Sequence, residues 1–209
     1  MSDKHLITTI DLLRHGECEG GEIFRGTTDV ALTDEGWKNM QRVIEQQQPE
    51  ENWDHVISSP LLRCRLFSES LNELHQIPLN IEDNFREMHF GDWEGKEVQT
   101  IWAKEKEKVE SIYSSPHTFQ APNGEAMTDF GARVISSTEK VLQEHKGKHI
   151  LLPQHGGTIR VVLTHLLSMP LSSMSRFHIP YACFSRIQIH HAGETEQVNL
   201  VFHNIPCRE

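Results

Sequence analysis

Two short motifs, each built around a His-Gly pair, hold the residues of this sequence best suited to chemistry. Arg14 and His15 belong to the first motif, RHGE, and His155 belongs to the second, QHGG. An imidazole can act as a nitrogen nucleophile, and a guanidinium offers a fixed fork of donors to a phosphate group. Each motif follows an apolar run that predicts a buried strand, ending at Leu13 and Pro153. Both motifs are therefore expected at the carboxyl edge of a sheet, where open α/β sheets place their chemistry.

Two further charged residues stand at places where a predicted strand or loop leads into a helix. Arg63 lies in SSPLLRC, and Glu87 lies in FREMHFGDWEG. Helix N-termini favour anions, so segments of this kind would build a phosphate pocket if they converged. Taken singly, Arg63 reads as a surface residue, Glu87 as a solvated side chain and His155 as a hydrogen-bonded core histidine. Their occurrence together favours a site.

The pattern of apolar residues and turn signals predicts alternating strands and helices, and hence an α/β fold with three layers: a mostly parallel central sheet flanked by helices. Thr33 is the expected N-cap of the first helix, and Pro60 is expected in the first turn of the second. No repeat or linker interrupts the chain, so a single domain over residues 1–209 is expected. The predicted strands are 6–13, 54–58, 78–82, 149–153, 183–191 and 197–204, the last two as a hairpin, and the predicted helices are 33–48, 59–74, 96–112, 125–145 and 156–167, with a loop at 114–124.

Charge and composition limit the classes of partner. The formal net charge of −10 argues against a general nucleic-acid binder or a binder of anionic membranes, but a local Arg/His pocket can still take a small anion. No run approaches the roughly 18 apolar residues of a membrane helix. Residues 1–5 lead into the first strand without an apolar leader, so a cytoplasmic protein is expected.

Cysteine and histidine spacing does not predict a metal centre. The four cysteines form no C-x-x-C pair, and the 14 histidines show no spacing typical of metal ligands. We expect no metal, no cofactor and no disulfide framework. The cysteines are Cys18, Cys64, Cys183 and Cys207.

Together the motifs RHGE, SSPLLRC, REMHFGDWEG and QHGGTIR, in this order between residues 12 and 160, resemble those of the histidine phosphatase superfamily. That superfamily includes cofactor-dependent phosphoglycerate mutase and fructose-2,6-bisphosphatase. The resemblance implies a phosphoglycerate-mutase-like fold with a cap or insertion at about 88–124, and a metal-independent phosphomonoesterase. Residues 21–33 are most similar to α-ribazole phosphatases, which implies hydrolysis of α-ribazole 5′-phosphate in cobalamin synthesis, so the expected partner is a small phosphorylated metabolite.

The resemblance also implies a role for each motif residue. His15 would form a phosphohistidine that water then hydrolyses, and Glu87 would protonate the leaving alkoxide and later activate the water. Surrounding cations are expected to lower the pKa of His15 and keep it nucleophilic. The expected phosphate ligands are Arg14, Arg63 and His155, with His155 also counted as catalytic, and the expected substrate loop is Arg25, Gly26 and Thr27.

Three residues depart from the family pattern. Cys18 replaces the usual Ser or Thr after RHGE, Gly21 stands where mutases carry Asn, and Gln154 replaces a small hydroxyl residue before His155. Gly21 and the short segment after Glu87 favour a phosphatase over a mutase. The aromatic residues available for an aromatic leaving group are Trp93, Trp102, Phe177 and Tyr181, with segments 96–123 and 178–184 as the remaining walls.

Other functions stay open on the sequence. A broad-specificity or sugar-phosphate phosphatase would use the same site on other esters, and a phosphoglycerate mutase is a further alternative. A non-catalytic phospho-ligand or interaction module would keep the fold without turnover. A metal-binding regulator would use the surplus of histidines. The oligomeric state is not indicated by any feature of the chain.

Overall fold

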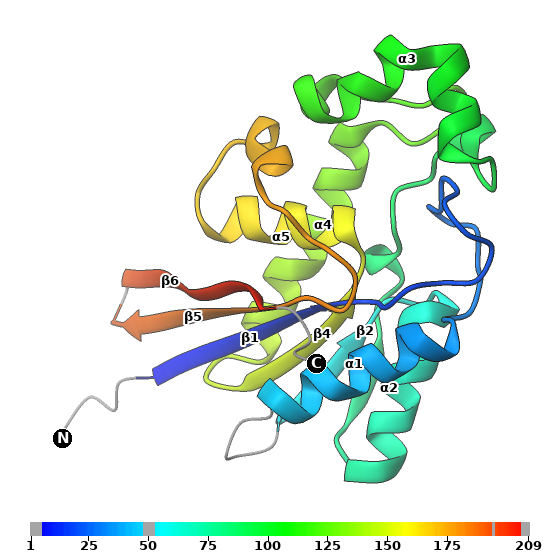
Figure 1. The fold of residues 1–209 in the computed structure, drawn as a ribbon. Helices are drawn as coiled ribbons and strands as arrows, with labels where there is room; N and C mark the ends of the chain where they lie inside the picture. Colours follow the sequence, from blue (N-terminus) through cyan, green and yellow to red (C-terminus); the bar gives the residue numbers. More distant parts are fainter. Residues whose placement is uncertain (1–5, 48–52, 194, 206–209) are drawn as a thin grey trace, which may run out of the picture.

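A mixed sheet of six strands, in the order β3-β2-β4-β1-β5-β6, forms the centre of the molecule in the computed structural model (Figure 1). Its first four strands are parallel, and the last two add an antiparallel hairpin. The expected sheet and hairpin are thus confirmed. The strands are β1 (Leu6–Arg14), β2 (His55–Ser58), β3 (Leu79–Ile81), β4 (His149–Gln154), β5 (Phe184–Ala192) and β6 (Thr195–Ile205).

The structure describes residues 6–47, 53–193 and 195–205. The N-terminal residues 1–5, Gln48 at the expected end of the first helix, and Cys207 lie outside the described residues. In the described part, no helix is long and apolar enough to cross a membrane.

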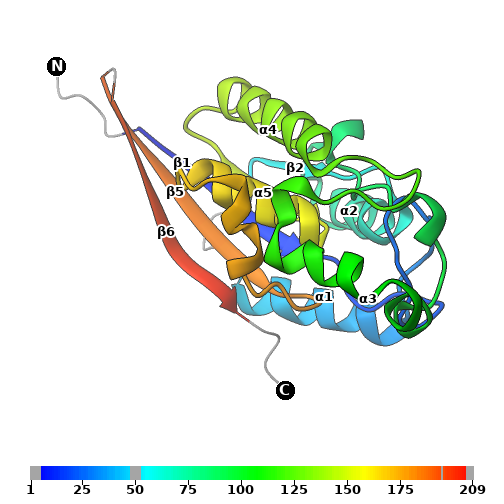
Figure 2. The same ribbon diagram turned by 90° about the horizontal axis from the view of Figure 1, so that it is seen from above.

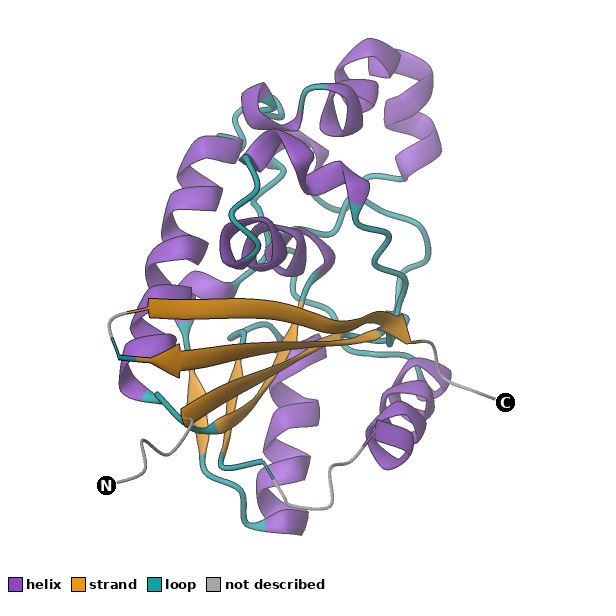
Figure 3. Ribbon diagram, turned by 90° about the vertical axis from the view of Figure 1, so that its left-hand side faces the viewer, coloured by secondary structure: helices purple, strands orange, loops and turns teal. Residues whose placement is uncertain are grey.

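Helices cover both faces of the sheet, which gives the three layers expected from the sequence (Figures 1 and 3). The strand β1 shows the reason: Ile10 and Leu12 belong to the apolar cluster that contains α4 and α5, whereas Leu13 belongs to the cluster that contains α1 and α2. A strand with apolar residues on both faces must be covered on both. The helices are α1 (Asp34–Gln47), α2 (Leu62–His75), α3 (Val98–Ser114), α4 (Met127–Glu144) and α5 (Gly156–Leu166).

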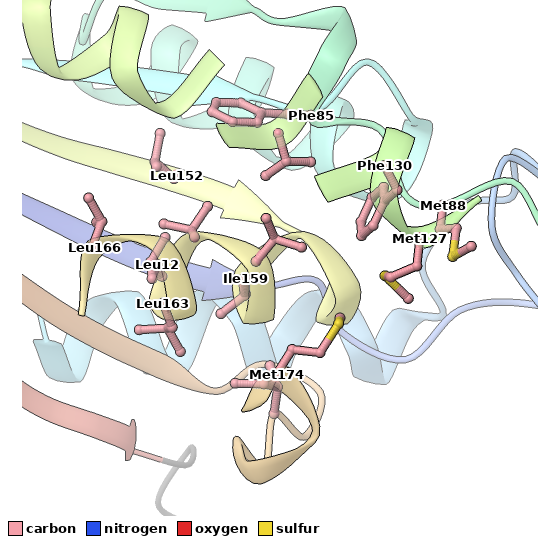
Figure 4. Packing of buried hydrophobic residues seen from close by; sticks show 14 of the residues in the cluster. Leu12, Phe85, Met88, Met127, Phe130, Leu152, Ile159, Leu163, Leu166 and Met174 are labelled. Atoms are coloured by element: carbon pink, nitrogen blue, oxygen red, sulfur yellow. The ribbon is translucent and has the colours of Figure 1, made fainter. Parts of the chain in front are cut away.

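The packing of α5 on β1 and β4 fixes the position of the second motif. Leu12 and Leu152 face Ile159 and Leu163 across this interface (Figure 4), and all four side chains are at most 1% exposed. Burying a side chain of this size stabilises the fold by about 1.5–3 kcal/mol. Such burial holds the N-terminus of α5, and with it His155, at the carboxyl edge of the sheet.

The first two helices begin differently. Thr33 caps α1 as predicted, because its Oγ1 accepts the Gly36 N–H at 2.9 Å. The predicted start of α2 at Ser59-Pro60 is wrong, since the helix begins at Leu62. The Ser59 hydroxyl accepts the Leu61 N–H and the Asp29 carboxylate accepts the Leu62 N–H. These side chains satisfy the backbone donors at the start of the helix, so the helix can begin at Leu62.

The helix α3 stands beyond the sheet, above α4 and α5 in Figure 1, and belongs to the expected cap (Figure 2). Its backbone leaves helical geometry at Glu105, whose carboxylate accepts the Trp93 indole N–H at 3.1 Å. The loop predicted at 114–124 contains a short 3-10 helix, Pro116–Thr118. Other short 3-10 helices span Asp83–Phe85, Gly91–Trp93 and Leu171–Arg176.

One buried carboxylate ties the sheet together away from its carboxyl edge. Asp11 of β1 accepts two hydrogen bonds from Arg186 of β5 at 2.6 and 2.8 Å, and one each from His149 and Trp53 at 2.8 Å. Burial alone would raise the pKa of Asp11, but the bonds from Arg186 and His149 outweigh it and lower the pKa. Its charge is therefore part of the folded structure.

Candidate active site

The two His-Gly pairs meet because their strands are neighbours. In the parallel pair of β1 and β4, Arg14 lies opposite Gln154, so His15 and His155 leave the sheet side by side. The His15 N–H donates to the Gln154 carbonyl at 2.9 Å, and the two imidazole centroids are 5.3 Å apart. Two motifs that are far apart in the sequence thus form one site at the carboxyl edge of the sheet.

The protonation of His15 follows from its surroundings. Its Nδ1 lies 2.8 Å from the Gly16 carbonyl oxygen, which can only accept, so Nδ1 carries the proton and Nε2 keeps its lone pair. Burial, followed by the positive charges of Arg14 and Arg63, holds the pKa of His15 well below the usual value of 6.5. At neutral pH the ring is uncharged and Nε2 can act as a nucleophile.

Arg14 presents its guanidinium to the cavity that adjoins His15. Its Nη1 donates to the Ile179 carbonyl at 2.6 Å, and the group lies 4.1 Å above the ring of Tyr181. Its Nε is buried without a hydrogen-bond partner in the structure. A buried donor on a fixed cation is suited to hold an anionic oxygen.

Glu87 reaches the same cavity from the loop after the 3-10 helix Asp83–Phe85. Its Oε1 accepts the Met88 N–H at 3.0 Å, and its Oε2 accepts the Gly157 N–H at 2.8 Å at the start of α5. The carboxylate therefore sits at a helix N-terminus, within the lining that also contains His15 and Arg14.

Arg63 and His155 are absent from the lining of this cavity, although the His155 ring lies beside that of His15 and the charge of Arg63 lowers the pKa of His15. The Arg63 Nε donates to His155 Nδ1 at 3.1 Å, so the proton of this ring is on Nε2, which donates to the Ser59 hydroxyl at 2.6 Å. Burial, then Arg63 and His15, hold the pKa of His155 well below its usual value. Both residues are fully buried.

The predicted substrate loop divides into one lining residue and two supporting residues. Arg25 lines the cavity, and its Nη2 donates to the carbonyls of Glu19 and Gly21. Contrary to expectation, Gly26 and Thr27 lie outside the lining. The Gly26 carbonyl instead accepts a bond from Arg63 at 2.7 Å, and a Cβ on Gly26 would lie 1.9 Å from the Met88 carbonyl oxygen, so only glycine fits there.

Glu94 holds that loop in place and was missed in the sequence, although it lies within a quoted motif. Its carboxylate accepts the N–H groups of Thr27, Thr28 and Phe90 at 2.8–2.9 Å, together with the Thr28 hydroxyl. Burial would raise the pKa of Glu94, but these hydrogen bonds lower it. The Thr28 carbonyl in turn accepts a bond from Arg63 at 3.0 Å, so Glu94 supports Arg63 through the loop.

A second support that the sequence did not reveal is the pair Arg133–Glu125, which clamps the Glu87 segment to α4. Arg133 donates to the carbonyls of Asn84, Arg86 and Glu87 at 2.5, 2.8 and 3.2 Å, and makes a bidentate pair with Glu125 at 2.7 and 2.8 Å. No motif signal marks this pair, because its partners are backbone carbonyls brought close only by the fold.

The cavity beside His15 has a volume of about 260 Å³, and polar and apolar groups have similar shares of its walls. The cap contributes Ile112, Tyr113 and Phe119, and α4 contributes Met127 and Phe130 (Figure 4). The other apolar lining residues are Ile23, Phe24, Met88, Phe90, Met174 and Tyr181. Such a wall suits an apolar or aromatic leaving group beside a charged phosphoryl group.

Of the four aromatic residues noted in the sequence, only Tyr181 lines this cavity. Trp93 is fully buried in the core beneath the cap, and Trp102 is 38% exposed. Phe177 packs against the core and offers its carbonyl to Arg160 at 3.1 Å. Arg160 also lines the cavity. It is the last residue of the motif QHGGTIR, but no functional role was predicted for it from the sequence.

The three departures from the family pattern have separate settings. The Cys18 thiol is buried 3.5 Å from His15 Nδ1, and burial raises its pKa. Gly21 is exposed with a φ of +69°. The Gln154 side chain is buried, with Oε1 unpaired, and His155 is bonded to Ser59 and Arg63 instead. Among the described residues, no group of three or more His, Cys, Asp or Glu side chains could hold a metal ion.

Comparison with known proteins gives a consistent result. The model of the histidine phosphatase superfamily (branch 1) matches residues 10–201. The adenosylcobalamin/alpha-ribazole phosphatase of Salmonella typhimurium is 26% identical over 85% of this chain and 89% of its own. Putative phosphoserine phosphatase 2 of Hydrogenobacter thermophilus is 28% identical over 94% and 95%. The structure of a putative alpha-ribazole-5′-P phosphatase from Escherichia coli has the same fold, with a TM-score of 0.79, 24% identity and coverage of 95% and 96%.

Proposed function

The chain belongs to the histidine phosphatase superfamily, whose members include phosphatases that hydrolyse phosphate monoesters, and we propose that it hydrolyses such an ester through a phosphohistidine on His15. The observation that carries this proposal is the state of His15: a neutral ring whose proton is on Nδ1, with Nε2 free, among cations at the base of a cavity. A nitrogen nucleophile needs this free lone pair.

In the first proposed step, His15 Nε2 attacks phosphorus while the bond from phosphorus to the ester oxygen breaks. Glu87, acting as general acid, passes a proton to the leaving alkoxide. In the second step a water gives its proton to Glu87 and attacks phosphorus, and the phosphorus–nitrogen bond breaks. Inorganic phosphate leaves, and His15 and Glu87 return to their starting states.

Charge developing on the phosphoryl oxygens is stabilised by Arg14, Arg63 and His155 in this proposal. Arg14 already faces the cavity. Arg63 uses three of its donor hydrogens on Gly26, Thr28 and His155, and a guanidinium has five, so two remain for an oxyanion. Fixed donors such as those of Arg14 act without reorganisation during the reaction. Arg63 and His155 lie outside the cavity lining, and both ring nitrogens of His155 already bond to Arg63 and Ser59, so these two residues reach the oxyanion only after a local rearrangement.

We propose α-ribazole 5′-phosphate as the substrate, in cobalamin synthesis. Support comes from the apolar, aromatic-rich cavity wall, which suits the aromatic base of this ester. It also comes from relatives named adenosylcobalamin/alpha-ribazole phosphatase, in Salmonella typhimurium and Escherichia coli, at 26% and 25% identity.

A broad-specificity or sugar-phosphate phosphatase is the second candidate. Two relatives named as phosphoserine phosphatases are each 28% identical over 198 residues, and these are at least as similar as the ribazole phosphatases. The probable phosphoglycerate mutase GpmB of Photorhabdus laumondii is 25% identical, which keeps a mutase as a third and weaker alternative.

The substrate is tested by phosphate release in EDTA from α-ribazole 5′-phosphate, 3-phosphoglycerate and p-nitrophenyl phosphate. We expect full activity in the chelator and a kcat/KM about a thousandfold higher for the ribazole ester, which corresponds to about 4 kcal/mol of differential transition-state binding. Equal and slow cleavage of all three esters would contradict the substrate.

The mechanism is tested separately with His15→Ala. We expect loss of turnover and loss of the acid-labile phosphoenzyme that the wild-type protein should accumulate after rapid quenching. His75→Ala, at an exposed histidine at the end of α2, is the matched control and should retain both. Turnover that survives in His15→Ala would rule out the phosphohistidine.

A further inference from the structure

Arg160 is a cation in the cavity that the proposed two-step reaction does not use. It lies on α5, one turn after Gly156, and lines the cavity. Its Nε donates to the Phe177 carbonyl at 3.1 Å, and no ion pair among the described residues includes it. A largely buried guanidinium without a carboxylate partner is costly unless a ligand bonds to it.

The structure holds Arg160 and Arg14 as neighbours. Carbonyls of one segment fix both, that of Phe177 for Arg160 and that of Ile179 for Arg14. A Cβ placed on Gly156 would lie 3.1 Å from Arg160 Nη1 and 3.4 Å from Arg14 Nε, so the two guanidinium groups flank this glycine. Burial and the charge of Arg14 lower the pKa of Arg160, as expected for two like charges at close range.

Arg14 ends β1 directly before His15, the proposed nucleophile, and both residues line the cavity, so Arg14 would face the phosphoryl group. Arg160 lies beside Arg14 across Gly156, and both Glu87 and Tyr113 are near enough to raise its pKa against the effects of burial and Arg14. Apolar side chains then continue the wall, among them Met127 and Phe130 (Figure 4). Beside the proposed nucleophile, the cavity therefore offers a leaving group both a second cation and an apolar surface.

We infer that Arg160 is a specificity-determining residue that binds the sugar hydroxyls of a leaving group joined directly to the phosphate, while the apolar wall takes an aromatic base. This inference rests on the proposed phosphatase activity and narrows its substrates to nucleoside-like 5′-phosphates. Hydroxyl oxygens suit the position because they accept hydrogen bonds from a cation without adding charge.

The experiment measures kcat/KM of wild-type protein and Arg160→Met on three esters in EDTA. α-Ribazole 5′-phosphate and ribose 5-phosphate carry sugar hydroxyls, and benzyl phosphate has an aromatic group without them. We expect a loss of about 10- to 100-fold on the two sugar phosphates, or about 1.4–2.7 kcal/mol, and less than about threefold on benzyl phosphate. Arg176→Met removes an exposed arginine outside the lining and should keep wild-type ratios.

Two results with Arg160→Met would overturn the inference. An equal loss of kcat/KM on all three esters would mean that Arg160 binds the phosphoryl group. Unchanged kcat/KM on both sugar phosphates would mean that Arg160 does not bind the sugar. Arg160→Lys keeps the charge without the fork, and should show an intermediate loss on the sugar phosphates even if the methionine variant is unstable. A wild-type protein that cleaves ribose 5-phosphate as well as the ribazole ester would contradict the proposed substrate alone, because the effect of Arg160→Met is read on either sugar phosphate.

Discussion

Replacing Gly157 by alanine moves the proposed general acid without adding or removing a titratable group. The Gly157 N–H holds Glu87 Oε2 at 2.8 Å. A Cβ on this residue would lie 2.4 Å from Glu87 Oε1, whereas ordinary contacts begin at 3.4 Å. The carboxylate must therefore move by about 1 Å, the difference between these two distances.

A shift of this size in a reacting group costs about 100-fold in rate, and general acid catalysis is worth about 10²–10⁴-fold. We expect kcat/KM for α-ribazole 5′-phosphate, which covers the reaction only up to departure of the alkoxide, to fall about 100-fold in Gly157→Ala. The fall for p-nitrophenyl phosphate should stay below about tenfold, because nitrophenolate leaves without needing a proton. Alanine favours a helix over glycine by up to about 1 kcal/mol, so unfolding should not account for the loss.

The assay compares kcat/KM of the two substrates, from initial phosphate release at substrate concentrations well below KM, so that hydrolysis of the shared phosphohistidine does not enter the comparison. Gly131→Ala is the control: it also changes a helical glycine, but its Cβ would meet only the Leu171 side chain, at 3.0 Å. That variant should keep the wild-type ratio of the two rates. Wild-type kinetics in Gly157→Ala, or an equal loss on both esters, would refute the acid role of Glu87.

Three further predictions concern stability and support of the site. Burial keeps the pKa values of His15 and His155 low only in the folded protein, so below about pH 6.5 the unfolded chain binds more protons than the folded one. The free energy of unfolding should therefore decrease as the pH is lowered below about 6.5, by up to about 2.7 kcal/mol per pH unit for the two groups. Urea titrations at several pH values should show a weaker pH dependence when both histidines are replaced by glutamine. Arg133→Met should lower kcat about tenfold or more and lower the free energy of unfolding by about 3 kcal/mol, because Glu125 and three backbone carbonyls lose their hydrogen-bond donor. An unchanged kcat would show that Arg133 does not position Glu87. Asp11→Asn should cost about 3 kcal/mol in urea unfolding, because a partly buried arginine loses its fully buried charged partner, while kcat at low temperature should stay near that of the wild-type protein.

Much of the fold could be predicted from local patterns. The strand from Leu6 and the helix capped by Thr33 are found as expected, because apolar periodicity and capping depend on residues close in the chain. The start of α2 was placed too early, since the acceptors that cap it include Asp29, far away in the sequence. Helix ends that are satisfied by distant side chains leave no local signal.

The sequence by itself determined the types and order of the motif residues, and with them the family and the candidate pair of histidines. Only the tertiary structure decided which residues face the cavity: Arg160 and Tyr181 line it, whereas Arg63 and His155 are fully buried outside its lining. The supports of the site, Glu94 and the clamp on the Glu87 segment, also emerged only from the fold. The physical reason is that these contacts join side chains to backbone groups of distant segments, and the spacing along one chain does not specify which backbone groups will meet.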